Sequence, residues 1–173
     1  MRLPKLVPIL FLLTWSMACN DDQQTPIRYD VPDEVEPFVQ KFIEEGKERG
    51  VDLVVDNLVV ELTSPVENNG QFVCGVTFGP VINLPQNYIE IDTQCLAWRH
   101  SEVSREILVF HELGHALLLR PHRTDLLPNF DFASIMVSST WNIDDFYTFD
   151  LTKREYYMDE LFDPSTPVPD WGN

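Results

Sequence analysis

Apolar residues recur every three or four positions near the start of the chain, between Pro32 and Gly50. This is the period of an amphipathic helix with one buried face. Acidic residues crowd its start and basic residues its end, which suits the helix dipole, and Gly50 can end it. We therefore predict a helix over residues 32–50, with its apolar face formed by Val35, Phe38, Val39, Phe42 and Ile43.

Three short apolar segments follow this helix and are bounded by turn residues. They cover residues 53–63, 71–78 and 87–92, and their pattern is typical of strands. Residues 64–70 contain Pro, Asn and Gly, which favour a turn between the first two strands. With short connections and no intervening helix, the pattern predicts a small, mostly antiparallel or mixed sheet rather than repeated βαβ units.

Helical periodicity returns twice in the second half of the chain. One helix is predicted from Ser101 to Leu119 and another from Thr152 to about Phe162. Helices and sheet together predict an α+β fold, in which a small mixed sheet packs on the N-terminal helix and on the helix after Ser101. Residues 164–173 are rich in Pro, and we expect them to form a loosely ordered tail.

The chain has 173 residues and a formal net charge of −16. This length fits one domain, and the negative charge argues against a nucleic acid as a partner. We expect a monomer. Cys74 and Cys95 can pair as a disulfide in an oxidising compartment, whereas two buried free thiols are the alternative.

The N-terminus has the form of an export signal. Arg2 and Lys5 precede an apolar run over residues 6–15 that is too short to span a bilayer. Small residues then lead to Cys19, as in a bacterial lipoprotein signal, where the cysteine carries lipid. We therefore predict a signal peptide over residues 1–18, lipidation of Cys19, a polar tether over residues 19–31 and a place in the cell envelope, on its periplasmic face or at the cell surface. An ordinary cleaved leader is the alternative.

The most informative motif is His-Glu-Leu-Gly-His, at residues 111–115. Residues i and i+4 of a helix share one face, so His111 and His115 can bind one metal ion while Glu112 lies beside it. Zinc suits imidazole ligands, and a neighbouring carboxylate can take the proton from a water molecule that attacks a carbonyl. The motif therefore predicts a single catalytic Zn²⁺ with Glu112 as general base.

A catalytic zinc commonly has three protein ligands. His122 is the expected third ligand, because Pro121 should end the helix and let the chain turn back. A carboxylate is the alternative, and the available residues are Asp125, Asp131, Asp144, Asp145 and Glu155.

Residues 106–136 resemble the metzincin clan of zinc endopeptidases, and in particular small lipoproteins of that kind in the Bacteroidetes. The clan carries H-E-x-x-H-x-x-G-x-x-H and a later turn with a Met beneath the metal; here Met136 ends Ser-Ile-Met. Two positions differ, since Leu118 replaces the glycine and His122 comes one residue late. The resemblance implies a metzincin-like catalytic domain over residues 32–163 that hydrolyses peptides or proteins.

The resemblance also implies secondary roles. Met136 would pack under the metal without binding it, and residues 87–92 would form the edge strand that receives the substrate backbone. Ser138 occupies the position of a tyrosine that assists the oxyanion in several metzincins, with Tyr147, Tyr156 and Tyr157 as substitutes. The alternative function is a non-catalytic surface lipoprotein that keeps the fold for binding or assembly.

Overall fold

The structure, a computed structural model, describes residues 27–79, 84–138 and 152–173. Within these ranges the long helices fall on the periodic segments of the sequence, although α1 begins at Glu36 rather than at residue 32. They are α1 (Glu36–Glu48), α2 (Leu96–Arg99), α3 (Glu102–Leu118) and α5 (Arg154–Phe162), with a short 3-10 helix, η2 (Asp170–Gly172).

The strands form a mixed sheet and a separate hairpin. The four-stranded sheet has the order β1 (Tyr29–Asp30), β2 (Leu58–Thr63), β6 (Asn87–Asp92), β5 (Gly75–Phe78). The pairs β1–β2 and β2–β6 are parallel, whereas β5 runs antiparallel to β6. The hairpin pairs β3 (Glu67–Asn68) with β4 (Gln71–Phe72). The prediction of an α+β fold with a small mixed sheet is confirmed.

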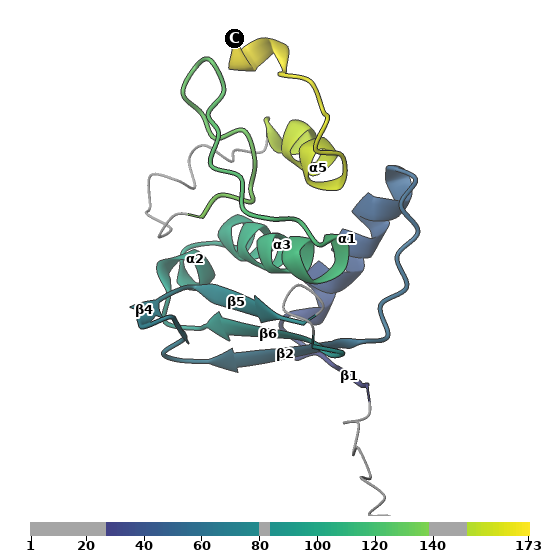
Figure 1. Ribbon diagram of the computed structural model, residues 1–173, viewed down its shortest axis with the longest axis vertical. Helices are drawn as coiled ribbons and strands as arrows, with labels where there is room; N and C mark the ends of the chain where they lie inside the picture. The colour runs from purple at the N-terminus through teal and green to yellow at the C-terminus, as the bar shows by residue number, and fades with distance from the viewer. Residues whose placement is uncertain (1–26, 80–83, 139–151) are drawn as a thin grey trace, which may run out of the picture.

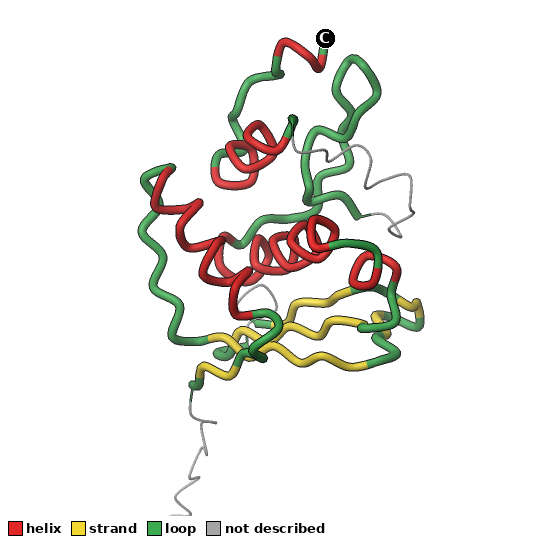
Figure 2. Tube along the Cα trace, turned by 180° about the vertical axis from the view of Figure 1, so that it is seen from behind, coloured by secondary structure: helices red, strands yellow, loops and turns green. Residues whose placement is uncertain are grey.

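The long helices lie on one side of the four-stranded sheet, and both views agree on this (Figures 1 and 2). Helix α3 packs directly on β5 and β6 and against α1. The ring of Phe42 on α1 lies 5.1 Å from that of Phe110 on α3 and 5.0 Å from that of Phe162 on α5. This shared apolar cluster fixes the three helices relative to one another, and so fixes the position of α3 above the sheet.

An ion-pair cluster reinforces the same arrangement. Glu106 on α3 accepts from Lys41 on α1 at 2.5 Å and from Arg154 on α5 at 2.7 Å. Ser101 begins α3, because its hydroxyl accepts from the backbone N–H of Ser104 in a capping box. Helix α3 is therefore held at its start by a cap and along its length by contacts with two other helices.

Several sequence expectations need correction. The first predicted strand, residues 53–63, is a strand only from Leu58, and the second, residues 71–78, is divided into β4 and β5. Helix α2 was not predicted, since four residues carry too little periodicity to recognise.

The prediction that residues 87–92 form the substrate-side edge strand is wrong. They form β6, which is paired on both sides, by β2 and by β5. The strand on the outside of the sheet next to α3 is β5. Strand β6 was expected at the edge because it is the strand nearest in sequence to the α3 motif. The preceding strand, β5, instead pairs antiparallel with β6 and forms that edge.

The C-terminal tail is not loosely ordered as expected. The Trp171 ring lies 5.3 Å from that of Tyr156, and the backbone N–H of Asn129 donates to the carbonyl of Gly172. Residues 164–173 therefore pack against the domain, because the tryptophan gives the Pro-rich segment an apolar anchor.

Candidate metal centre

Helix α3 carries the first part of the site. His111, Glu112 and His115 lie in its second half, and the first two are almost fully buried. The helical repeat places the two imidazoles on the same face, one turn apart. Burying this many polar groups is costly unless each has a partner, so the contacts of each side chain decide what the site can do.

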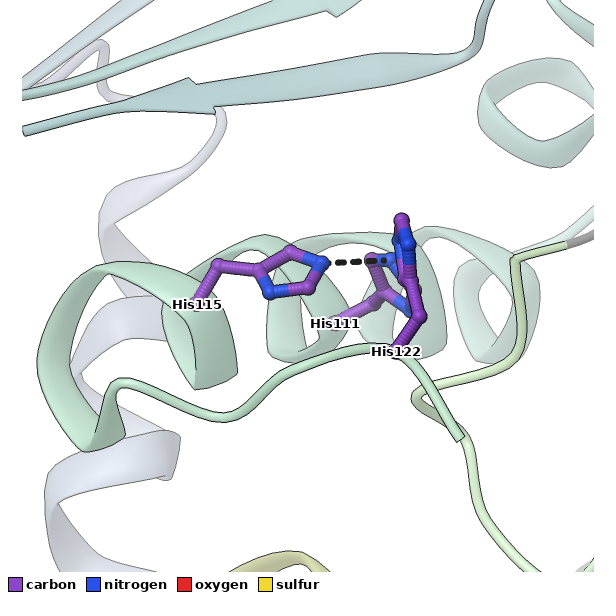
Figure 3. A group of neighbouring side chains, drawn as sticks. All are labelled: His111, His115 and His122. Atoms are coloured by element: carbon purple, nitrogen blue, oxygen red, sulfur yellow. Dashed lines mark hydrogen bonds between the residues drawn. The ribbon is translucent and has the colours of Figure 1, made fainter. Parts of the chain in front are cut away.

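The third histidine returns to the first two because α3 ends abruptly. Leu119 adopts a left-handed conformation with φ 54°, and the backbone N–H of Arg120 donates to the carbonyl of Gly114 at 3.0 Å. The turn therefore occurs two residues before Pro121, which was expected to cause it. Figure 3 shows His122, on the loop after this turn, beside the imidazoles of His111 and His115, and one ring nitrogen from each lies within 4.8 Å of the others.

Backbone carbonyls fix the tautomers of two of these histidines. The Nδ1 of His111 lies 2.7 Å from the carbonyl oxygen of Ile135, and the Nδ1 of His115 lies 2.6 Å from that of Arg120. A carbonyl oxygen can only accept a hydrogen bond, so both Nδ1 atoms carry the proton. Each Nε2 then carries the lone pair of the neutral ring, through which it can bind a metal ion.

Burial keeps these rings neutral. It lowers the pKa of His111 to about 3 and that of His115 to about 4, and it also lowers the pKa of His122. The Nε2 atoms of His111 and His115 lie 3.2 Å apart. Because both rings carry their proton on Nδ1 at neutral pH, the lone pairs of the two Nε2 atoms face each other without a proton between them. A shared cation would turn that repulsion into attraction, so the donor set fits a metal ion.

The carboxylate of Glu112 contacts the edge strand β5. The Thr77 hydroxyl on β5 donates to its Oε2 at 2.7 Å. Burial raises the pKa of Glu112 and the bond from Thr77 partly offsets this, so that the pKa lies at about 7. Gly75 leaves room for the carboxylate, because a Cβ there would come within 2.5 Å of Glu112 Oε1. Neither Thr77 nor Gly75 carries a signal in the sequence that links it to residue 112.

A cavity of about 670 Å³ opens over this arrangement. The motif of α3 and the loop after it form one wall, and β5 with the β3–β4 hairpin forms another. Ser138 and Val137 also line it. The residues on the cavity therefore combine three imidazoles, the buried carboxylates of Glu112 and Asp92 and the backbone of an edge strand. Those that the site uses are Gly75, Val76, Thr77, His111, Glu112, His115 and His122.

The segment containing Met136 passes beneath α3. Met136 is fully buried, and a Cβ on Gly114 would come within 2.7 Å of its sulfur. Its backbone N–H donates to the Ser134 hydroxyl at 3.0 Å, and the neighbouring carbonyl of Ile135 is the partner of His111. The turn thus supports the site by packing and through a backbone oxygen.

The described carboxylates that were alternatives to His122 are engaged elsewhere. Asp125 pairs with Arg123 at 3.1 Å, Asp131 with Lys153 at 2.8 Å, and Glu155 with Arg49 at 2.9 Å. Asp144 and Asp145 lie outside the described residues. In the part of the chain that the structure describes, the three histidines are the group close enough to hold a metal ion.

The tyrosines considered for oxyanion assistance have other roles where they are described. The hydroxyls of Tyr156 and Tyr157 donate to the carbonyls of Ala133 and Phe132. Both side chains are therefore part of the packing around the loop before Met136. Tyr147 lies outside the described residues.

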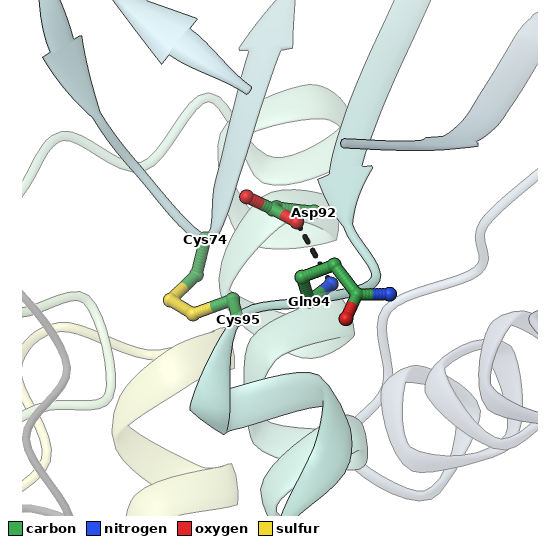
Figure 4. The surroundings of a disulfide bond; sticks show 4 residues. All are labelled: Cys74, Asp92, Gln94 and Cys95. Carbon is green, nitrogen blue, oxygen red and sulfur yellow. Dashed lines mark hydrogen bonds between the residues drawn. A yellow bond between two sulfur atoms is a disulfide. The ribbon is translucent and has the colours of Figure 1, made fainter. Parts of the chain in front are cut away.

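Cys74 and Cys95 form a disulfide, with their Cα atoms 5.3 Å apart. Figure 4 shows it joining the start of β5 to the start of α2, beside Asp92, whose carboxylate accepts from the backbone N–H of Gln94 at 2.8 Å. Both cysteines line the cavity. The bond therefore restrains β5 next to Gly75, which lies against the Glu112 carboxylate.

Comparison of the chain with protein-family models, curated proteins and solved structures gives no match. Among the described helices, none has the length and apolar character needed to cross a bilayer. The predicted signal peptide over residues 1–18 and Cys19 lie outside the described residues.

Proposed function

We propose that this protein is a zinc-dependent metallopeptidase with a metzincin-like domain. The observation that carries the proposal is the convergence of His111, His115 and His122 on one wall of a cavity, with Glu112 buried on α3 beside the first two. The edge strand β5 forms the opposite wall. These parts match the needs of metal-assisted peptide hydrolysis: nitrogen ligands, a general base and a surface for an extended chain.

The donor set supports zinc as the metal. In a tetrahedron with zinc–nitrogen bonds of about 2.0–2.1 Å, two ligand atoms lie about 3.3–3.4 Å apart. The Nε2 atoms of His111 and His115 are 3.2 Å apart. With His122 as third ligand, one position stays open for water, as in catalytic sites. When bound, zinc supplies a Lewis acid that acidifies water and polarises a carbonyl.

The protein's own groups handle the proton. Glu112 accepts it from the attacking water at a carboxylate oxygen and later donates it to the leaving amine. A pKa raised toward neutrality by burial suits a group that must do both. The Thr77 hydroxyl orients the carboxylate through its bond to Oε2. The carbonyls of Ile135 and Arg120 keep the proton on Nδ1 of their histidines, so that Nε2 stays available.

The edge of β5 is the surface we propose for the substrate. One side of β5 pairs with β6, and its other side has no strand among the described residues. A peptide that lies there in extended form would make main-chain hydrogen bonds to β5 and would pass beside Glu112. This mode favours unfolded or extended polypeptide over a folded protein and imposes only modest sequence preference.

We also propose that Cys19 anchors the enzyme to the cell envelope through lipid. The support is the form of the N-terminal segment alone. Mass spectrometry of protein extracted from membranes should find acyl chains on Cys19, and an unmodified soluble chain would reject the anchor.

The test of function combines metal content with turnover of a quenched peptide library. We expect one zinc per wild-type chain, much weaker binding in His122→Ala, and unchanged zinc content in Glu112→Gln with a rate at least ~100-fold lower, because only the base is lost. Glu112→Gln is the matched control, since it keeps size and metal ligands. Zinc bound without cleavage by the wild type would favour the binding role instead.

A further inference from the structure

The loop that carries His122 is fastened to the C-terminal helix by a buried carboxylate. Glu160, on α5, is fully buried. Its Oε1 accepts from Arg120 Nη2 at 2.6 Å and from Arg123 Nη1 at 2.8 Å. These two arginines lie two residues before and one residue after His122. A single carboxylate oxygen therefore ties down both sides of the proposed third ligand.

Arg120 is joined to α5 by more than this ion pair. Its Nη1 donates to the carbonyls of Glu160 and Leu161 at 2.6 and 2.8 Å, in the last turn of the helix. A guanidinium at that place also complements the negative end of the helix dipole. Its own carbonyl oxygen accepts from His115 Nδ1 at 2.6 Å. Arg120 thus connects α5 to the second metal ligand as well as to the third.

The other side of the loop is fixed to the Met136 turn. The backbone N–H of Arg123 donates to the carbonyl of Met136 at 2.7 Å. The residue before Met136, Ile135, gives its carbonyl to His111. His111 and His115 are therefore positioned by backbone carbonyls, and the segments on both sides of His122 are held by arginines that converge on Glu160.

We propose that Glu160 is a positioning residue for the metal ligands, and that α5 is part of the metal centre although none of its side chains lies on the metal-binding histidines. The proposal rests on the proposed zinc site. The physical reason is that α3 ends at Leu118 and His122 lies on a loop without secondary structure, so the loop needs an external restraint to keep an imidazole within reach of a metal. Glu160 supplies it through two short, charge-assisted bonds.

The test measures zinc affinity of the full chain by competition with a chromogenic chelator. We expect Glu160→Gln and Arg123→Gln to bind zinc about 10–100-fold more weakly than the wild type, the range for residues that orient metal ligands. Arg123 is partly exposed, so its variant should fold even if Glu160→Gln does not. We call Glu160 and the two arginines that it binds, Arg120 and Arg123, the clamp. Arg49→Gln is the matched control, because Arg49 pairs with Asp159 and Glu155 of α5 and not with a residue of the clamp.

A second readout needs no metal. The backbone amides of residues 120 and 123 are both hydrogen-bonded in the structure. Their hydrogen exchange should become at least tenfold faster in Glu160→Gln and Arg123→Gln and should stay unchanged in Arg49→Gln. Unaltered zinc affinity and exchange in the two clamp variants would overturn the inference, as would an equal loss in Arg49→Gln. If the wild type binds no zinc, the proposed function fails while exchange still decides whether Glu160 holds the loop; zinc binding without peptide cleavage leaves the clamp standing.

Discussion

Thr77 is the residue on which the state of Glu112 depends. It donates to Glu112 Oε2 at 2.7 Å, and this bond partly offsets the effect of burial, which leaves the carboxyl pKa raised to about 7. Hydrogen bonding favours the charged form of an acceptor carboxylate. Thr77→Val keeps the shape of the side chain but removes the hydroxyl, so the pKa of Glu112 in the metal-free protein should rise further.

The measurement is a carboxyl-carbon NMR titration of the metal-free protein. Thr93→Val is the control, because the Thr93 hydroxyl donates to the carbonyl of Thr63 and not to the site. A Glu112 pKa that does not move in Thr77→Val would show that the bond in the structure does not stabilise the carboxylate.

At the scale of single elements, the disulfide between the start of β5 and the start of α2 restrains the edge strand. Cys74 and Cys95 are separated by 21 residues, and closing a loop of that length stabilises by about 3 kcal/mol in the chain-entropy model. We expect the Cys74→Ala/Cys95→Ala variant to lose about 2–4 kcal/mol of unfolding free energy in urea. Reductant should lower the stability of the wild type by a similar amount and leave the variant unchanged; equal sensitivity of both proteins would contradict the assignment.

Hydrophobic periodicity predicted the long helices correctly, but it did not predict the order of the strands, which depends on how they pair. Helix α3 was predicted within one residue at each end, because its apolar periodicity is a local signal. The order of the strands is not local. Only the pairing of β6 with both β2 and β5 shows that the edge strand is β5, and the sequence of residues 87–92 carries no sign of it.

The candidate site divides in the same way. His111, Glu112 and His115 follow from one helical motif, and His122 follows from the need for a third ligand. The roles of Thr77 and Glu160 could not be predicted, because these residues are 35 and 48 positions away from Glu112 in the sequence, respectively. Their roles arise from how β5 and α5 pack on α3, and packing of distant segments leaves no fixed spacing in a sequence.

At the scale of the whole molecule, the buried histidines make the metal-free fold sensitive to acid. The folded pKa values of His111 and His115 are about 3 and 4, against an ordinary 6.5. Between pH 6.5 and 4 the unfolded chain therefore holds a proton on each that the folded protein lacks, and falling pH favours unfolding. Glu112 acts in the opposite direction, because its folded pKa of about 7 lies above an ordinary 4.5, so the folded state holds the extra proton.

His111 and His115, together with His122, whose pKa burial also lowers, outweigh Glu112, and the metal-free protein should lose stability as pH falls from 7 to 4. In Glu112→Gln the opposing contribution of the carboxyl group is gone. The unfolding free energy should therefore fall more steeply between pH 7 and 4.5, by a slope that corresponds to at most one additional proton taken up on unfolding. In His111→Gln the loss should be shallower, because the destabilising protonation of His111 is removed. Urea denaturation of the three metal-free proteins at each pH measures these slopes, and comparing variants cancels the titration of the surface carboxylates. Parallel curves would mean that the site does not titrate with folding, and that these side chains are not buried as the structure places them.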